Sequence, residues 1–135
     1  GSPPVAEAVG LRAALGWLSG LDWTELEAHE ERLLAAALES LSAADGVRVL
    51  GPADPAAVSG CVSFTVEGVH PHDVTEILGR QGLCLRAGHH CAQPLHRRLG
   101  IAASTRLSIC AHTTDDEVRA VAPAVAEARR FLLGR

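Results

Sequence analysis

The sequence predicts a small two-layer α+β domain. A roughly four-stranded, mainly antiparallel sheet is expected to carry helices on one side, with a long N-terminal helical pair before it. The 135 residues suit one domain with a core of its own. Apolar residues recur at helical spacing over the first 42 residues, and short strand-like runs then alternate with further helical patterns. That order is typical of a sheet with helices packed on it.

Two helices are predicted at the N-terminal end. The first covers residues 5–18, and the second begins at Asp22 or Thr24 and runs to Leu41. Trp17 and Trp23 are expected to be packing residues rather than ligand contacts. Because this pair precedes the sheet, we expect it to connect the domain to something else.

Four strands are predicted after the helical pair, at residues 47–50, 60–66, 83–87 and 104–110. A helix is predicted between the second and third strands, from Pro71 or Asp73 to about Gln81, and a short one at residues 95–99. The last helix is expected to start in an acidic turn near residue 115 and to run nearly to the end. Pro123 lies inside this pattern and predicts a kink or a second helix start.

Charge and composition argue against several classes of function. The formal net charge is −4 and there is no basic run, which argues against nucleic-acid binding. No apolar stretch approaches the length of a membrane span and no signal peptide is present, so we expect a cytoplasmic protein without a membrane partner. Cys61, Cys84 and Cys110 lie in strand-like runs, which favours reduced, buried thiols over a disulfide framework.

The absence of lysine limits the chemistry of this chain more than any motif does. The sequence has 12 residues that are Lys or Arg, and all of them are arginine. An internal Schiff base with pyridoxal phosphate requires a lysine amine. The chain alone therefore cannot form one.

The segment RAGHHCAQPL, residues 86–95, is the strongest candidate for a reactive site. It follows a short apolar run and precedes a helical pattern that Pro94 opens. A thiol at the end of a strand, just before a helix and beside histidines, is in a setting that stabilises a thiolate. The alternative is a buried structural cysteine, which is a common role of a free cysteine.

This segment resembles the cysteine loop of SUF-type (group II) cysteine desulfurases, in the class-V aminotransferase family of fold-type-I pyridoxal-phosphate enzymes. The segments GSPPVAEAVGLRAALGWLSG, GVRVLGP, VSFTVEGVHPHDV and STRLSI occur in the family's order and spacing. The resemblance covers essentially the whole chain, but only the C-terminal domain of such an enzyme, without the large domain and its lysine. It implies a helical connector at residues 1–42 and an α/β sandwich with the cysteine loop at residues 43–135.

The resemblance also implies roles for individual residues. Cys91 would be the nucleophile, and Arg106 would bind the substrate carboxylate; the alternative for Arg106 is a surface salt bridge. Ser2 stands where the family has a threonine that contacts the cofactor phosphate of the partner subunit. His72 stands where a family histidine takes a zinc ligand position on the acceptor; the alternative is a turn histidine that caps a helix. The residues expected to support the thiol are Arg86, Gly88, His89 and His90, and no metal site is expected.

For the full-length protein, the resemblance implies pyridoxal phosphate as cofactor, a homodimer and a sulfur acceptor of SufU or SufE type. The enzyme would convert L-cysteine to L-alanine, hold the sulfur as a persulfide on Cys91, and pass it on for iron–sulfur cluster assembly. The isolated chain is expected to be inactive. Two alternatives stay open: a stand-alone sulfur carrier or partner-binding module, and a structural zinc domain.

Overall fold

The structure is a computed structural model and describes residues 1–134. These residues contain five α-helices and four strands, in the order that the sequence predicts, and one short 3-10 helix that was not predicted. The elements are α1 (Val5–Leu18), α2 (Trp23–Ala43), β1 (Val47–Leu50), η1 (Pro55–Ala57), β2 (Cys61–Val66), α3 (Pro71–Arg80), β3 (Arg86–Gly88), α4 (Gln93–Leu99), β4 (Ser104–Ser108) and α5 (Asp115–Leu133).

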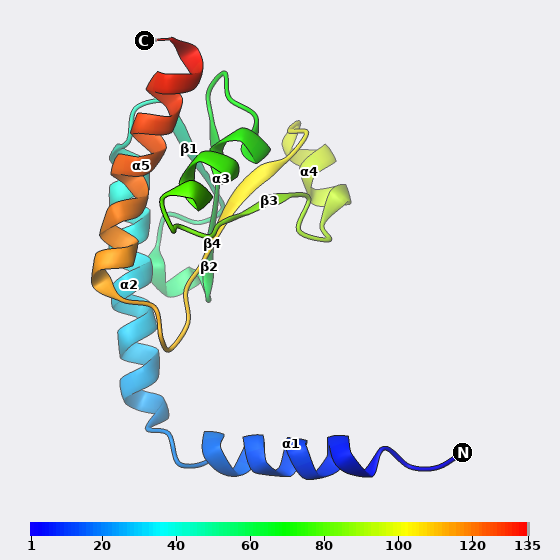
Figure 1. Cartoon of the computed structure of the whole chain (residues 1–135). Helices are drawn as coiled ribbons and strands as arrows, with labels where there is room; N and C mark the ends of the chain where they lie inside the picture. Colours follow the sequence, from blue (N-terminus) through cyan, green and yellow to red (C-terminus); the bar gives the residue numbers. More distant parts are fainter. Residues whose placement is uncertain (135) are drawn as a thin grey trace.

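The four strands form one sheet in the order β1-β2-β4-β3, and every neighbouring pair is antiparallel. Helix α2 packs on β1 and β2, α3 packs on β3 and β4, and α5 lies against both helices (Figure 1). Along β2 the side chains of Val62, Phe64 and Val66 are buried, while those between them are only partly buried. This alternation shows a sheet with one face on the core. The predicted α+β class is confirmed.

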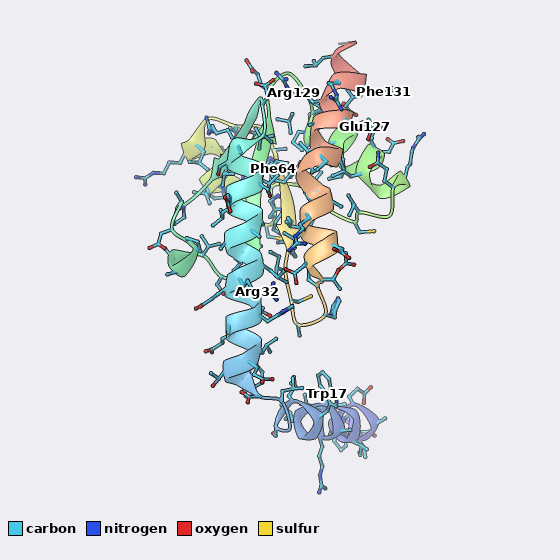
Figure 2. The ribbon with its side chains drawn as sticks, turned by 90° about the vertical axis from the view of Figure 1, so that its left-hand side faces the viewer. Trp17, Arg32, Phe64, Glu127, Arg129 and Phe131 are labelled. Atoms are coloured by element: carbon cyan, nitrogen blue, oxygen red, sulfur yellow. The ribbon has the colours of Figure 1, made fainter. Side chains whose placement is uncertain are left out.

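The core is one cluster of aliphatic side chains around Phe64. The side chain of Phe64 is fully buried in β2, between α2 and α5 (Figure 2). The only other phenylalanine, Phe131, lies on α5 and is 76% exposed. The two phenylalanines therefore offer a matched test of the core.

Phe64→Ala is expected to destabilise the chain by about 3–5 kcal/mol, because it removes a buried ring and leaves a cavity. Phe131→Ala is expected to change the free energy of unfolding by no more than about 0.5 kcal/mol, as is usual for an exposed position. Urea denaturation followed by circular dichroism measures both. Equal losses for the two variants would contradict the assignment of the core.

Three element predictions need correction. Strand β3 covers Arg86–Gly88 rather than residues 83–87, and β4 ends at Ser108 rather than at residue 110. Helix α5 runs without a break from Asp115 to Leu133, so Pro123 starts no second helix. Residues 83–85, just before β3, form no strand because the pairing with β4 starts only at Arg86. Leu83 and Leu85 instead pack against the core, partly buried.

Helix α1 has no buried residue and projects away from the rest of the molecule (Figure 1). Trp17 is 66% exposed and Trp23 is 51% exposed, so neither packs in the core of this chain. Their role as packing residues rather than ligand contacts stays a prediction. Figure 2 shows Trp17 on α1, well away from the region where α2 and α5 pack side by side. The exposed apolar side chains of α1 are Val5, Val9, Leu11 and Leu15.

Helix α2 has two different halves. Its first half carries no buried residue, whereas Leu33, Leu34, Ala37, Leu38 and Leu41 of its second half all join the core. The helix thus links the projecting α1 to the packed domain. Within residues 1–134, no helix combines the length and apolarity needed to cross a membrane.

Candidate functional site

Cys91 lies on the loop between β3 and α4, and its side chain is exposed. It lines a surface pocket of about 600 Å³ together with Arg86, Ala87, His89, His90, Gln93 and Pro94. The exposure excludes the alternative of a buried structural cysteine at this position. The predicted loop residues Arg86, His89 and His90 line the same pocket as the thiol, whereas Gly88 does not. Their role in supporting the thiol stays a prediction.

The backbone of this loop is left-handed at the thiol. His90 has a φ of 51° and Cys91 a φ of 61°. Gly88, two residues before His90, has a φ of 128°. Only glycine adopts such angles freely, whereas other residues pay about 1–3 kcal/mol each. Contacts from outside the loop must therefore stabilise this conformation at His90 and Cys91.

Those contacts come from Ser104 and His96. The Nε2 atom of His90 lies 3.1 Å from both the carbonyl oxygen and the Oγ of Ser104. His96 is buried, and its Nε2 lies 2.9 Å from the same Oγ, while its Nδ1 lies 3.0 Å from the carbonyl oxygen of Ala92. Neither Ser104 nor His96 was predicted as a site residue from the sequence. The only signal was a histidine inside the short predicted helix at residues 95–99.

Two arginines lie opposite each other at this edge of the sheet. Arg86 of β3 and Arg106 of β4 are direct register partners, and Ser63 of β2 is the partner of Arg106 on its other side. Because Leu107 points into the core, the neighbouring Arg106 points to the opposite face of the sheet. Like charges on facing residues repel each other, so this face is suited to an anion.

Arg106 takes part in no ion pair within residues 1–134, so the alternative of a surface salt bridge fails for the described part of the chain. Its Nε atom is buried and lacks a hydrogen-bond partner among these residues. A guanidinium with a free donor suits the predicted role of binding a carboxylate.

Burial lowers the pKa of His90 below its ordinary value of 6.5. The positive charges of Arg106 and Arg86 lower it further, and the hydrogen bond to the Ser104 carbonyl opposes them. The Nδ1 atom of His90 is buried and has no partner among the described residues. A proton there would be buried without an acceptor, so the ring is neutral at neutral pH.

A proton titration of His90 by NMR is expected to give a midpoint below 6.5. Since the unfolded chain takes up this proton at the ordinary pKa and the folded chain only at lower pH, the contribution of His90 to stability is present above pH 6.5 and declines as pH falls below it. A midpoint above 6.5 would contradict the arrangement described for the ring.

The other predicted site residues lie apart from the thiol loop. Ser2 precedes α1, which Figure 1 shows at the far end of the molecule from α4. His72 is exposed in the first turn of α3, and its ring centroid lies 5.1 Å from that of His70. His70, not His72, caps the helix: its Nδ1 accepts a hydrogen bond of 3.3 Å from the His72 backbone N–H. The helix-cap alternative for His72 is therefore wrong.

All four cysteines are free, as expected, but they are not buried. Cys84 is exposed, and Cys61 and Cys110 are partly exposed. The expectation of buried thiols is therefore wrong. Cys84 precedes β3 and Cys110 follows β4, while Cys61 is on the face of β2 opposite the buried Val62. In the part of the chain that the structure describes, no three His, Cys, Asp or Glu side chains gather closely enough to hold a metal ion.

Comparisons with known proteins show the family of the chain. The family model for aminotransferase class-V matches residues 1–121. The "Probable cysteine desulfurase 2" of Mycobacterium leprae is 44% identical over 131 residues, which are 97% of this chain and 31% of that protein. The cysteine desulfurase of Haloferax volcanii is 41% identical over the same length, covering 97% of this chain and 30% of that protein.

Solved structures give the same result. The apo cysteine desulfurase of Thermococcus onnurineus matches with a TM-score of 0.89 and 32% identity, covering 100% of this chain and 33% of that one. The Escherichia coli cysteine desulfurase CsdA, in an S-sulfonic acid form, matches with a TM-score of 0.85 and 33% identity, covering 97% of this chain and 32% of that one. The chain thus spans about a third of the length of the proteins that it matches.

Proposed function

Because the chain belongs to the aminotransferase class-V family, we propose that it is the C-terminal, thiol-bearing part of a pyridoxal-phosphate-dependent cysteine desulfurase. One observation carries the proposal most strongly. Cys91 is an exposed thiol on a short loop beside β3, and the arginine pair Arg86–Arg106 lies on that strand and its neighbour. The residues that we propose as nucleophile and as carboxylate-binding group thereby lie on the same side of the sheet, at β3 and the neighbouring β4.

The cofactor would be held by a large domain that this chain does not contain. Without a lysine, the chain cannot bind pyridoxal phosphate covalently. We propose that the hydroxyl of Ser2 contacts the phosphate of the cofactor that the partner subunit binds. When bound, the cofactor would supply the electron sink that weakens the carbon–sulfur bond of L-cysteine. The exposed apolar side chains of α1 support the presence of such a domain, because nothing in this chain covers them and a second domain could bury them.

The residues of this chain would perform two steps. Arg106 would bind the carboxylate of L-cysteine by a charge-assisted pair of hydrogen bonds. The thiolate of Cys91 would then attack the sulfur of the substrate. A sulfur–sulfur bond forms as the carbon–sulfur bond breaks, and the carbon fragment leaves as L-alanine after protonation. The persulfide on Cys91 would then be passed to an acceptor.

The wider setting is part of the same proposal. Residues 1–42 would connect the large domain to the α/β sandwich of residues 43–135, and the full-length protein would be a homodimer. The acceptor would be of SufU or SufE type within the SUF system of iron–sulfur cluster assembly, with His72 exposed on α3 to meet its zinc. A cytoplasmic location suits a thiol that must stay reduced.

The proposal predicts that the isolated chain, mixed with pyridoxal phosphate and L-cysteine, releases no alanine. Alanine release by the chain alone would contradict the requirement for a lysine from elsewhere. A stand-alone sulfur carrier, favoured only by the exposure of Cys91, predicts a different result. It would gain one sulfur atom by mass when a separate desulfurase and L-cysteine are added. Metal analysis of the purified chain tests the zinc-domain alternative.

A further inference from the structure

We propose that Ser104, His90 and His96 form a clasp that holds the Cys91 loop in its left-handed conformation. In this assignment the three residues position the thiol and do not themselves react. The purpose of the clasp rests on the proposed function, but its geometry lies entirely within the described residues.

The contacts of the clasp meet on one atom, the Oγ of Ser104. His90, which directly precedes Cys91, approaches this oxygen at 3.1 Å. His96 approaches it at 2.9 Å and also reaches the carbonyl of Ala92, which directly follows Cys91, at 3.0 Å. Both neighbours of the thiol are thereby tied to a single strand residue. These contacts therefore span His90 and Cys91, the two residues whose backbone is left-handed.

The acceptors fix where the protons lie. A carbonyl oxygen only accepts, so the Nδ1 of His96 carries its proton and donates to Ala92. The Nε2 of His96 is then an acceptor, and it receives the hydroxyl proton of Ser104. The Nε2 of His90 carries a proton and donates to the carbonyl and Oγ of Ser104. The Nε2 proton of His90 is shared between two acceptors, the other two protons have one acceptor each, and His96 is in the Nδ1–H form.

The clasp is dry at its centre. Ser104 has no exposed surface and His96 is 5% exposed. Water therefore cannot easily replace a lost hydrogen bond there, which makes each contact more valuable than it would be at the surface. The rings of His96 and His89 also meet edge to face, with centroids 5.4 Å apart.

The placement of Ser104 gives the clasp its consequence for the thiol. Ser104 is two residues before Arg106 on β4, and alternate residues of a strand share a face. A loop tied to Ser104 is therefore held in a fixed relation to the guanidinium that we assign to the substrate carboxylate. Releasing the tie would leave Arg106 in place but free the thiol.

The first test needs no variant. Long-range ¹H–¹⁵N NMR of the isolated chain above pH 7 reports which ring nitrogen of each histidine carries the proton. The clasp predicts Nδ1–H for His96 and Nε2–H for His90. A proton on the Nε2 of His96 would overturn the clasp.

The second test is Ser104→Ala, with Ser108→Ala as control on an exposed position of the same strand. The backbone N–H of Ala92, which donates to the His89 carbonyl at 2.8 Å, reports on the loop. Its hydrogen exchange is expected to be at least about tenfold faster in Ser104→Ala, the factor expected for one ordinary hydrogen bond, and unchanged in the control. Unchanged exchange in a folded Ser104→Ala would overturn the clasp. If that variant does not fold, the positions of the ring protons of His96 and His90 in the wild-type chain decide whether the clasp exists.

The third test separates positioning from mere structure and uses the full-length protein. Ser104→Ala is expected to lower kcat for alanine formation from L-cysteine roughly tenfold with KM unchanged, because only the thiol is displaced. An unchanged kcat would overturn the positioning role. If the tautomers are as predicted but the wild-type protein puts no sulfur on Cys91, the proposed function fails and the clasp stands.

Discussion

Cys91→Ser in the full-length protein is expected to reduce alanine formation from L-cysteine at least about 100-fold. Serine keeps the size and the left-handed position of the side chain, but its hydroxyl neither ionises near neutral pH nor forms a stable bond to sulfur. The sulfur would then have no acceptor on the chain. Binding of L-cysteine should persist, since it depends on Arg106 and on the large domain.

The matched control is Cys84→Ser. Cys84 is also an exposed free thiol and lies seven residues before Cys91, yet it stands outside the pocket around Cys91. Its replacement is expected to leave turnover within about twofold of wild type, as is usual for a surface change. A large loss for Cys84→Ser together with normal turnover for Cys91→Ser would identify Cys84, and not Cys91, as the reactive thiol.

Arg106→Gln is expected to lower kcat/KM for L-cysteine by roughly 100-fold, which corresponds to about 3 kcal/mol of lost charge-assisted hydrogen bonding. Arg106→Lys should recover only part of this loss, because an ammonium keeps the charge but not the planar fork. Steady-state kinetics over a range of L-cysteine concentrations measures both variants.

Arg48→Gln is the control for Arg106. Arg48 lies on β1 and pairs with Thr65, so it shares the sheet face of Arg106 but is two strands away from it. Its removal is expected to leave kcat/KM nearly unchanged. Equal losses for Arg48→Gln and Arg106→Gln would indicate a general effect of positive charge on that face rather than a specific carboxylate site.

The sequence predicted the elements whose signals are local. The bounds of α1 and β1 were predicted to the residue, because helical spacing and alternation are properties of neighbouring residues. The start of β3 was not. Leu83 and Leu85 alternate as a strand would, but pairing requires a partner. On the side facing this segment, β4 pairs only with Arg86, Ala87 and Gly88. Which residues pair with a strand from another part of the chain cannot be predicted from the local alternation of apolar residues.

The candidate site divides in the same way. Cys91 and Arg106 were predicted as site residues from the motifs around them, whereas His96 and Ser104 meet only in the fold and have no periodic signal. The exposure of Trp17 and Trp23 was missed for a different reason. Their size predicts burial, but burial depends on whether a surface to cover them belongs to the same chain.

The central claim is that Cys91 receives the sulfur of L-cysteine. Its most direct test is peptide mass spectrometry of the full-length protein after a single turnover with L-cysteine, with the free thiols trapped by alkylation. We predict one additional sulfur atom on the peptide that contains Cys91 and none on those that contain Cys61, Cys84 or Cys110. Alanine formed with the sulfur on another cysteine, or on none, would contradict the account.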